Sequence, residues 1–337
     1  MKPVIFCFFS ILLFACEQTE DIPPVLYPEK YDDALNTEFS TRILEGFFVT
    51  AMDFDQLGNA WIGTFNQGLI KYNPQETVVY DTSNSDIPCV PIWDVTVDSK
   101  NNVWIGCESL IQFDGNRFTT YNSGNSKIPE DFISSIAVDS KDNVWFASCR
   151  FREGGLVKFD GSQFTVYTPE NSPLPVNLIH GIAIDVNDIV WLAVTETVTE
   201  THLVKISRGK WTLFTKNELG FSPYYIGNIQ INSDNKVCAA IDYSLSSTWV
   251  NSGPQVFIFD GRVTEQLQFD DVTKVRSVTV DRSDHLWCTT WNGYAVYDGN
   301  HWKVDDSTFS DTGVFTIEQA PDARIWIGTG NGIYINE

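Results

Sequence analysis

Seven side chains of differing chemistry occupy one position of a repeating pattern, each eleven residues before a tryptophan or, once, a cysteine. They are Thr50, Trp93, Ser134, His180, Gly227, Arg276 and Phe315. Aromatic rings stack on sugars, and imidazole and guanidinium groups hydrogen-bond to hydroxyls or carboxylates. With nearby aromatic residues added, the predicted ligand-binding set is Trp93, His180, Arg276, Phe315, Tyr224, Tyr225 and Trp291. The alternative is that these side chains only fill or rim a central channel.

The sequence gives less support for catalysis than for ligand binding. The chain has four histidines, His180, His202, His285 and His301, and we expect the last two to be solvent-exposed. No Gly-x-Ser-x-Gly elbow, His-Glu-x-x-His motif or phosphate loop occurs. The many carboxylates cannot be paired into an acid and a base from the sequence alone. We therefore predict no catalytic residue, no metal site and no cofactor.

The elements that position these residues repeat along the chain. The units are marked by Trp61, Trp104, Trp145, Trp191, Cys238, Trp287 and Trp326, in steps of 39 to 49 residues. Twelve and nine residues before each marker the side chain is apolar. Six before, it is Asp or Asn, except for Ala320. A period of about 40–45 residues with four strands per unit is typical of propeller blades. The sequence predicts an all-β, seven-bladed β-propeller with four-stranded antiparallel blades.

Each repeated position has a structural role. The apolar positions predict a buried inner strand, and the marker tryptophan fills the wedge between blades. The Asp opens a turn by accepting backbone N–H groups; cation binding is the less favoured interpretation. Asp-Gly pairs such as Asp114-Gly115, and Arg208-Gly209, predict two-residue type I′ turns. The longest insertions, 148–155, 195–202 and 243–253, predict surface loops.

The last unit lacks a fourth strand, because the chain ends soon after its third. An unpaired outer edge is unfavourable, so we expect an N-terminal strand to close the ring. In other units the fourth strand lies 24 residues before the next marker, and the same count from Trp61 reaches Thr37. Residues 34–41 are therefore predicted to complete the last blade.

The N-terminus predicts export and anchoring. Residues 1–15 have a basic start and an apolar core too short to span a membrane. Leu13-Phe14-Ala15-Cys16 resembles the lipobox of bacterial lipoproteins, which implies lipidation at Cys16; an ordinary secretory signal is the alternative. Residues 16–33 predict an acidic tether and 34–337 the propeller. We expect an outer-membrane lipoprotein on the periplasmic or cell-surface face.

Charge and cysteine content limit the partners. The formal net charge of −22 disfavours nucleic acid, and we expect a monomer kept apart by like charge. Beyond Cys7 and Cys16, five cysteines remain: Cys89, Cys107, Cys149, Cys238 and Cys288. An odd number leaves at least one free thiol. Cys107 and Cys149 follow equivalent strands of adjacent units, which brings them close enough to be considered a pair.

The phrases DSKNNVWIG, DSKDNVWFA, WIGTFNQGLIKYN and IWIGTGNGIYI resemble the two-component regulator propeller family across all seven units. In that family such propellers form periplasmic sensor parts of hybrid histidine kinases, often for polysaccharide fragments. No kinase segment follows Glu337, so the resemblance implies only the ligand-binding role here. Seven-bladed rings similar to this one also include streptogramin lyases, which use His, Glu and magnesium.

Three functions remain open from the sequence. The favoured one is a lipid-anchored, sensor-like propeller that binds a small molecule or an oligosaccharide at the mouth of the ring. The second is a scaffold for a protein partner. The third is a lyase-like or hydrolase-like enzyme built around His180.

Overall fold

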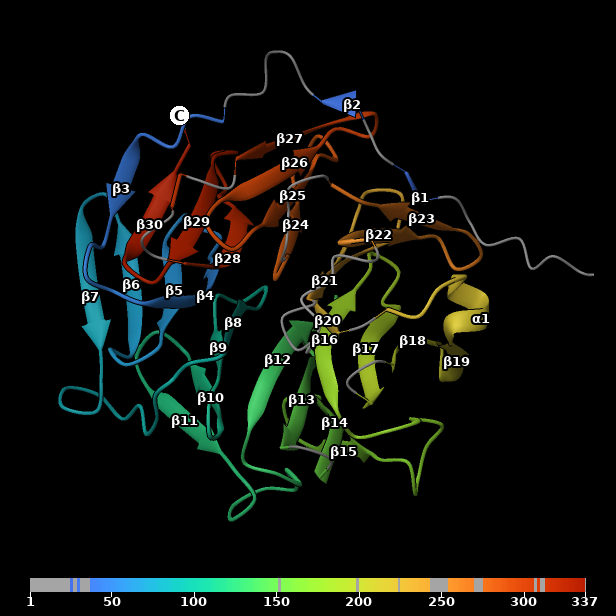
Figure 1. Ribbon diagram of the computed structural model, residues 1–337. Helices are drawn as coiled ribbons and strands as arrows, with labels where there is room; N and C mark the ends of the chain where they lie inside the picture. Colours follow the sequence, from blue (N-terminus) through green and yellow to red (C-terminus); the bar gives the residue numbers. More distant parts are fainter. Residues whose placement is uncertain are drawn as a thin grey trace, which may run out of the picture.

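The computed structural model describes residues 25–26, 29–30, 37–150, 153–197, 200–223, 225–242, 254–269, 275–305, 308–309 and 313–336. Predictions for the signal segment, for Cys16 and for residues 34–36 fall outside these ranges. Within them, seven sheets, each with four antiparallel strands, stand around a central axis, and two of the sheets carry a fifth strand (Figure 1). The prediction of an all-β, seven-bladed propeller is confirmed.

The first four blades follow the chain from the inner strand outward. Blade 1 contains β4 (Val49–Phe54), β5 (Ala60–Thr64), β6 (Leu69–Asn73) and β7 (Glu76–Tyr80). Blade 2 contains β8 (Asp94–Val97), β9 (Val103–Gly106), β10 (Leu110–Phe113) and β11 (Phe118–Tyr121). Blade 3 contains β12 (Ile133–Val138), β13 (Val144–Arg150), β14 (Glu153–Phe159) and β15 (Phe164–Tyr167). Blade 4 contains β16 (Ile179–Ile184), β17 (Val190–Thr197), β18 (Glu200–Ser207) and β19 (Lys210–Phe214).

The last three blades also use N-terminal strands. Blade 5 contains β20 (Tyr225–Ile231), β21 (Val237–Asp242), β22 (Val256–Phe259), β23 (Thr264–Leu267) and β1 (Val25–Leu26). Blade 6 contains β24 (Val278–Val280), β25 (Leu286–Thr289), β26 (Tyr294–Tyr297), β27 (His301–Asp305) and β2 (Glu29–Lys30). Blade 7 contains β28 (Val314–Gln319), β29 (Ile325–Thr329), β30 (Gly332–Ile335) and β3 (Thr41–Ile43). A short helix, α1 (Lys216–Leu219), follows β19 and has a capping box formed by Thr215 and Glu218.

The hydrophobic core is divided among the wedges between neighbouring blades. In one wedge, Trp61 and Leu69 of blade 1 pack with Val103 and Ile111 of blade 2. Trp61 is 4% exposed, so nearly all of its large apolar surface is removed from water. The predicted role of the marker tryptophan is confirmed.

The turn between the first two strands of a blade is held by its aspartate. In blade 1, Asp55 Oδ1 accepts the backbone N–H groups of Leu57 and Asn59 at 3.0 and 2.8 Å. Its Oδ2 accepts the indole N–H of Trp61 at 3.0 Å. The predicted Asx-turn is therefore present, and the same carboxylate also satisfies a buried donor of the wedge.

The predicted type I′ turn is present at Arg208-Gly209 but not at the Asp-Gly pair of blade 2. Only Arg208-Gly209 forms a two-residue turn with positive φ at both residues, 49° and 78°. In blade 2 the connection spans residues 114–117. There, Gly115 alone has positive φ while Asp114 caps Asn116 and Arg117. Asp114 keeps a negative φ, and its carboxylate accepts the two N–H groups of the turn. The type I′ prediction, which needs positive φ at both residues, is therefore wrong for this Asp-Gly pair.

The ring is closed by an N-terminal strand, but further along the chain than the spacing predicted. β3 pairs antiparallel with β30, Thr41 opposite Ile335 and Ile43 opposite Ile333. The 24-residue count fails because only residues 44–48 separate β3 from β4, whereas residues 81–93 separate β7 from β8. Thr37 instead contacts blade 6, where its carbonyl accepts the hydroxyl of Tyr294 at 3.0 Å.

Pairing continues further toward the N-terminus. β1 lies parallel to β23 and β2 parallel to β27, as fifth strands on blades 5 and 6 (Figure 1). Both lie within the segment whose composition predicted a tether. Part of that segment therefore covers two outer sheet edges that would otherwise present unpaired backbone groups.

Two further corrections concern the loops and the cysteines. Residues 148–155 and 195–202 belong mainly to extended hairpins, β13–β14 and β17–β18; residues 243–253 lie outside the described ranges. Cys107 forms a disulfide with Cys89, not with Cys149, because the loop entering blade 2 brings Cys89 against the end of β9. Cys149, Cys238 and Cys288 are buried free thiols.

Candidate functional site

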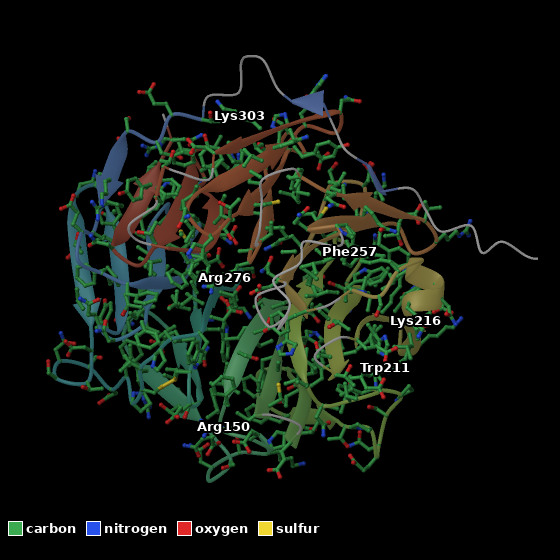
Figure 2. The ribbon with its side chains drawn as sticks, viewed as in Figure 1. Arg150, Trp211, Lys216, Phe257, Arg276 and Lys303 are labelled. Atoms are coloured by element: carbon green, nitrogen blue, oxygen red, sulfur yellow. A yellow bond between two sulfur atoms is a disulfide. The ribbon has the colours of Figure 1, made fainter. Side chains whose placement is uncertain are left out.

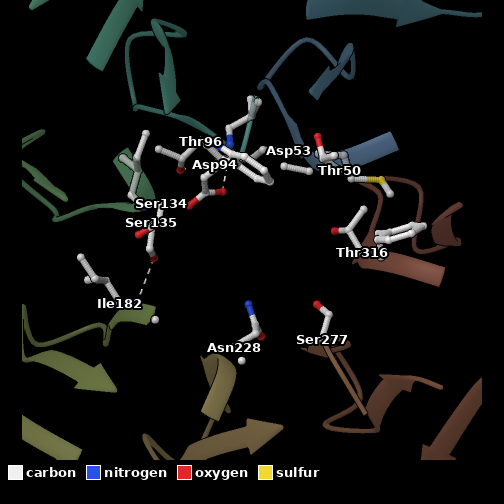
Figure 3. A pocket seen from close by; sticks show the side chains of 18 of the residues that line it. Thr50, Asp53, Asp94, Thr96, Ser134, Ser135, Ile182, Asn228, Ser277 and Thr316 are labelled. Atoms are coloured by element: carbon white, nitrogen blue, oxygen red, sulfur yellow. Dashed lines mark hydrogen bonds between the residues drawn. The ribbon is translucent and has the colours of Figure 1, made fainter. Parts of the chain in front are cut away.

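A central channel runs between the innermost segments of all seven blades. It has a volume of about 410 Å³ and is lined mainly by polar side chains, several of which Figure 3 shows pointing inward. One end of the channel lies where the inner strands begin, and its lining there includes Trp93, His180, Arg276 and Phe315. We call that end the ring mouth.

The chemically mixed position of the repeat is a β-bulge. In five blades the pairing of the inner strand skips one residue; the skipped residues are Thr50, Ser134, His180, Gly227 and Phe315. Trp93 and Arg276 stand just before β8 and β24. A bulge releases a residue from the ladder and redirects its side chain. The repeat therefore presents its variable residues at the ring mouth.

Deeper in the channel, side-chain oxygens cap backbone groups of the next blade. Asp53 Oδ2 accepts the N–H of Val97 at 2.7 Å, and Asp94 Oδ2 accepts that of Ile136 at 2.7 Å. Ser135 and Asn228 do the same for Ile182 and Val278. The inner strands have an open edge toward the channel, so these oxygens satisfy N–H groups that lack a strand partner.

Three carboxyl groups gather in this channel. Removal from bulk water raises the pKa of Asp53 to about 6, that of Asp94 to about 7 and that of Glu318 to about 8. Repulsion among the three adds to the rise in Asp94 and Glu318. Sequence reasoning missed them, although they stand eight or ten residues before their markers and so share one face of the inner strands.

A second cavity, the lateral pocket, opens beside the ring mouth between blades 2 and 5. It measures about 530 Å³, and its lining includes Trp93, Phe132, Ser134, Arg150, His180 and Tyr225. Trp93 and Phe132 lie 5.8 Å apart between ring centres, and the Arg150 guanidinium lies 5.5 Å over Phe132. Arg150 also pairs with Glu108 at 3.1 Å. This volume is within the range of small-molecule sites.

The inner wall of the lateral pocket holds a histidine–tyrosine pair. The Tyr225 hydroxyl lies 3.0 Å from His180 Nδ1. Burial lowers the pKa of His180 to about 4 and raises that of Tyr225 to about 12, so both are neutral at pH 7. When Tyr225 donates to Nδ1, Nε2 carries the imidazole proton.

Two polar atoms of this wall are left without a partner. His180 Nε2 and Ser134 Oγ are buried and make no hydrogen bond to a nitrogen or oxygen atom within the described part of the chain; Ser134 has the Cys149 thiol beside it. Buried polar atoms are normally satisfied, and leaving one unpaired costs about 1–3 kcal/mol. Water or a ligand in the lateral pocket would remove that cost.

Across the ring mouth, Arg276 lies between two aromatic rings. Its guanidinium is 4.8 Å from the centre of Trp291 and 5.3 Å from that of Phe315. Figure 2 shows Arg276 near the middle of the ring. Contacts between rings continue from Phe315 through Phe48 and Phe65 to Trp93, with centroid distances of 4.5, 5.1 and 6.3 Å. We call this row the aromatic arc.

The predicted binding residues therefore fall into two groups. Trp93, His180 and Tyr225 line the lateral pocket, whereas Arg276, Phe315 and Trp291 gather on the other side of the mouth. Tyr224 lies outside the described residues. Phe48 and Phe65, which join the groups, were missed because neither occupies the bulged position. Whether any of these residues binds a ligand stays a prediction.

The remaining histidines are placed as follows. His285 hydrogen-bonds Asp281 at 2.9 Å in the turn of blade 6, and its side chain is 25% exposed, so it is less exposed than expected. The His301 side chain is 45% exposed, as expected. His202 is buried and lies 3.2 Å from Glu196. Among the described residues, no group of three His, Cys, Asp or Glu side chains has the geometry to hold a metal ion. No helix in the described ranges is both long and apolar enough to cross a membrane.

This geometry defines a seven-bladed β-propeller with a built cavity at one end of its channel. No protein-family model and no curated protein matches the sequence. Among solved structures, it is similar to the extracellular domain of the putative hybrid two component system BT3049 from B. thetaiotaomicron, with 17% identity and a TM-score of 0.66. The alignment covers 92% of this chain and 41% of that one, so the chain spans about two fifths of that domain.

Two other similar structures have different roles. Virginiamycin B lyase from Staphylococcus aureus is 12% identical with a TM-score of 0.69, covering 88% of this chain and 98% of the lyase. PorZ, a bacterial surface component of the type-IX secretion system of Porphyromonas gingivalis, is 14% identical with a TM-score of 0.67. The alignment covers 85% of this chain and 46% of PorZ. At such identities the likeness establishes the fold, which is shared by sensors, an enzyme and a secretion component.

Proposed function

We propose that this protein is an extracytoplasmic, sensor-like propeller that binds a glycan fragment at the ring mouth. The observation that carries the proposal is the lateral pocket, where an aromatic wall faces two buried polar atoms without partners. A sugar ring combines an apolar face with hydroxyls that donate and accept. It therefore matches Trp93 and Phe132 on one side and Ser134 and His180 on the other.

The aromatic arc extends the proposed site. Trp93 is 37% exposed, Phe65 44% and Trp291 43%, which is unusual for such large apolar side chains. The Arg276 guanidinium at the far end contacts Trp291 and Phe315 and makes no hydrogen bond to a described residue, so its donors are available to ligand hydroxyls or carboxylates. A glycan longer than one ring would extend from the lateral pocket along this row.

We also propose that the protein is held on the outer membrane through a lipid on Cys16. The lipobox-like segment supports this, and the similarity to an extracellular sensor domain agrees with export. Two or more acyl chains on one cysteine give stable membrane attachment. Mass spectrometry of the N-terminal peptide tests the modification, and a Cys16→Ser variant should move from the membrane to the soluble fraction.

An enzymatic role has weaker support. His180, the best-placed histidine, is hydrogen-bonded to Tyr225, and no carboxylate in the described ranges bonds to it. A lyase of the streptogramin type would need acidic partners and a metal at this place. The structure brings the histidine to the ring mouth with a tyrosine, rather than a carboxylate, as its hydrogen-bond partner.

A thermal-shift screen against glycans and divalent metals tests the proposed function. A glycan at 100 times its dissociation constant should add about 2.7 kcal/mol to the free energy of unfolding. Trp93→Ala should weaken binding at least tenfold, because the ring stacks on the sugar. Leu57→Ala, an exposed residue in the turn at the opposite end of β4, is the matched control.

Each outcome of the screen has a defined consequence. A glycan response that Trp93→Ala removes and Leu57→Ala keeps supports the ring mouth as the site. A response to metals alone would favour the enzyme. Silence for glycans and metals, with a protein that co-purifies, would favour the scaffold.

A further inference from the structure

The hydrogen bond between turn aspartate and marker tryptophan is present in four blades. The indole N–H groups of Trp61, Trp104, Trp145 and Trp287 donate to Asp55, Asp98, Asp139 and Asp281 at 2.9 to 3.1 Å. The residue two before the tryptophan also donates to the carboxylate: Asn59, Asn102, Asn143 or His285. A carboxylate at this place is thus part of the repeat.

Blade 7 keeps the turn but lacks the carboxylate. Ala320 stands where the aspartate would be, and its N–H still bonds the carbonyl of Arg324 at 2.8 Å, as in the other turns. Trp326 is 5% exposed, and its indole nitrogen has no partner in the described part of the chain. Ala320 is itself 2% exposed. A buried donor is therefore left where four other blades supply a carboxylate.

A cavity lies at this place. It measures about 310 Å³, and Ala320, Arg324 and Trp326 all line it, together with residues of β3, β4, β6 and β30. Its position is the junction where blade 7 meets blade 1, toward the end of the inner strands opposite the ring mouth. We call it the junction cavity. It shares no lining residue with the lateral pocket.

The junction cavity has one charged wall and one apolar wall. Arg324 stands where the four turns with a bond between carboxylate and indole place Asn or His, and its guanidinium lies 2.7 Å from Asp322 at the rim. Phe54 and Tyr72 pack edge-on to Trp326, at 5.2 and 5.9 Å between ring centres. A compact apolar body would contact these rings, while its anionic end would meet the indole donor.

Trp191 provides an internal comparison. Its indole nitrogen also lacks a partner among the described residues, but Asp185 stands at the expected place six residues before it. Ile189 there replaces the Asn that orients the carboxylate in blades 1 to 3. In blade 4 the aspartate is present and accepts the backbone N–H groups of Asn187 and Ile189, although it makes no hydrogen bond to Trp191. In blade 7 the side chain is missing and a cavity stands in its place.

We propose that the junction cavity binds a small organic carboxylate with an apolar or aromatic body. The ligand carboxylate would replace the missing aspartate side chain by accepting the indole N–H of Trp326, near the Arg324 guanidinium. A hydrogen bond to a charged acceptor is stronger than one to a neutral group, so the site favours the ionised acid over a neutral analogue.

Benzoate tests the proposal, with benzyl alcohol as its neutral counterpart. The readout is the indole N–H resonance of Trp326 in ¹H–¹⁵N NMR spectra, assigned by its loss in Trp326→Phe. Benzoate should shift this resonance and raise the melting temperature, and benzyl alcohol should bind at least tenfold more weakly. An unmoved Trp326 resonance at saturating benzoate would overturn the proposal and leave water as the partner.

Restoring the carboxylate is the matched genetic test. Ala320→Asp should reproduce the bond seen in four other blades, stabilise the protein and weaken benzoate binding at least tenfold. Val263→Asp adds the same charge at an exposed turn and should leave benzoate binding unchanged. If Ala320→Asp does not fold, Ala320→Asn serves instead, since Asn232 occupies this position in blade 5. Undiminished benzoate binding in the folded variant would contradict the proposal.

Discussion

At the scale of the residue, one aspartate carboxylate in each of four blades accepts hydrogen bonds both from the backbone of its turn and from the marker tryptophan. Asp98 accepts the backbone N–H groups of Lys100 and Asn102 and the indole N–H of Trp104. It thereby closes a surface turn and satisfies a donor in the wedge between blades. The same few atoms connect the local turn to the packing of two sheets.

Removing that carboxylate should be costly. Asp98→Ala leaves the indole N–H of Trp104 buried without an acceptor, and we expect the free energy of unfolding to fall by about 1–3 kcal/mol. Asp98→Asn retains an oxygen acceptor and should lose less. Urea unfolding of both variants measures the difference. Equal losses in the two would show that the charge, rather than the acceptor, stabilises the turn.

The channel carboxyls predict a dependence of stability on pH. Burial raises the pKa of Glu318 from 4.5 to about 8, so the folded protein binds this proton more tightly than the unfolded chain. Its contribution to stability is therefore complete below about pH 4.5 and is lost as the pH rises toward 8. Glu318→Gln should be more stable than the natural protein at pH 8, by on the order of 1 kcal/mol or more.

Urea unfolding at pH 5 and pH 8 tests this prediction. The gain from Glu318→Gln should be larger at pH 8 than at pH 5. Glu76→Gln, on the exposed part of β7, controls for the loss of one negative charge. A gain that is the same at both pH values would contradict the raised pKa.

At the scale of the element, most residues of each inner strand stabilise the fold, and one residue faces the proposed site. Its regular residues pack the wedges and cap the neighbouring blade, whereas its bulged residue turns toward the ring mouth. His180 and Phe315 are free to vary because the ladder does not use them. The proposed site therefore takes Trp93, Ser134, His180, Arg276 and Phe315 from equivalent positions of the repeat.

The disulfide acts on one of these elements. Cys89 and Cys107 are 18 residues apart, and their bond fixes the segment that enters blade 2 just before Trp93. Closing a loop of this length stabilises a protein by about 3 kcal/mol. We expect reductant to lower the melting temperature of the natural protein but not that of the double variant Cys89→Ala, Cys107→Ala. The same effect of reductant on both would contradict this role.

The fold could be predicted from the sequence, whereas many residues of the proposed site could not. Residues equivalent to Trp104 and Asp98 recur along the chain in a fixed register with each other, so these two repeated positions predict the blades, the wedges between them and the turns. The bulged column predicted which residues meet at the mouth. Phe65 and Phe132 belong to no such column, and the partner of Cys107 depends on the path of a loop. The position of β3 was misjudged because the connection after it is unusually short.

At the scale of the whole molecule, the two proposed binding sites lie in separate cavities of the ring. The lateral pocket and the aromatic arc lie at the mouth, and the junction cavity lies toward the other end between blades 7 and 1. The N-terminal strands β1, β2 and β3 cover the outer edges of three successive blades before the chain enters blade 1 (Figure 1). With the lipid proposed at Cys16, this path would connect the anchor directly to the ring.

The most direct measurement is a crystal structure of the protein with the glycan that gives the largest thermal shift. We predict that a sugar ring stacks on Trp93 in the lateral pocket and hydrogen-bonds to His180 Nε2 and Ser134 Oγ. Further sugar units should extend along the aromatic arc toward Arg276. A glycan bound elsewhere on the ring, with the lateral pocket holding only water, would contradict the account.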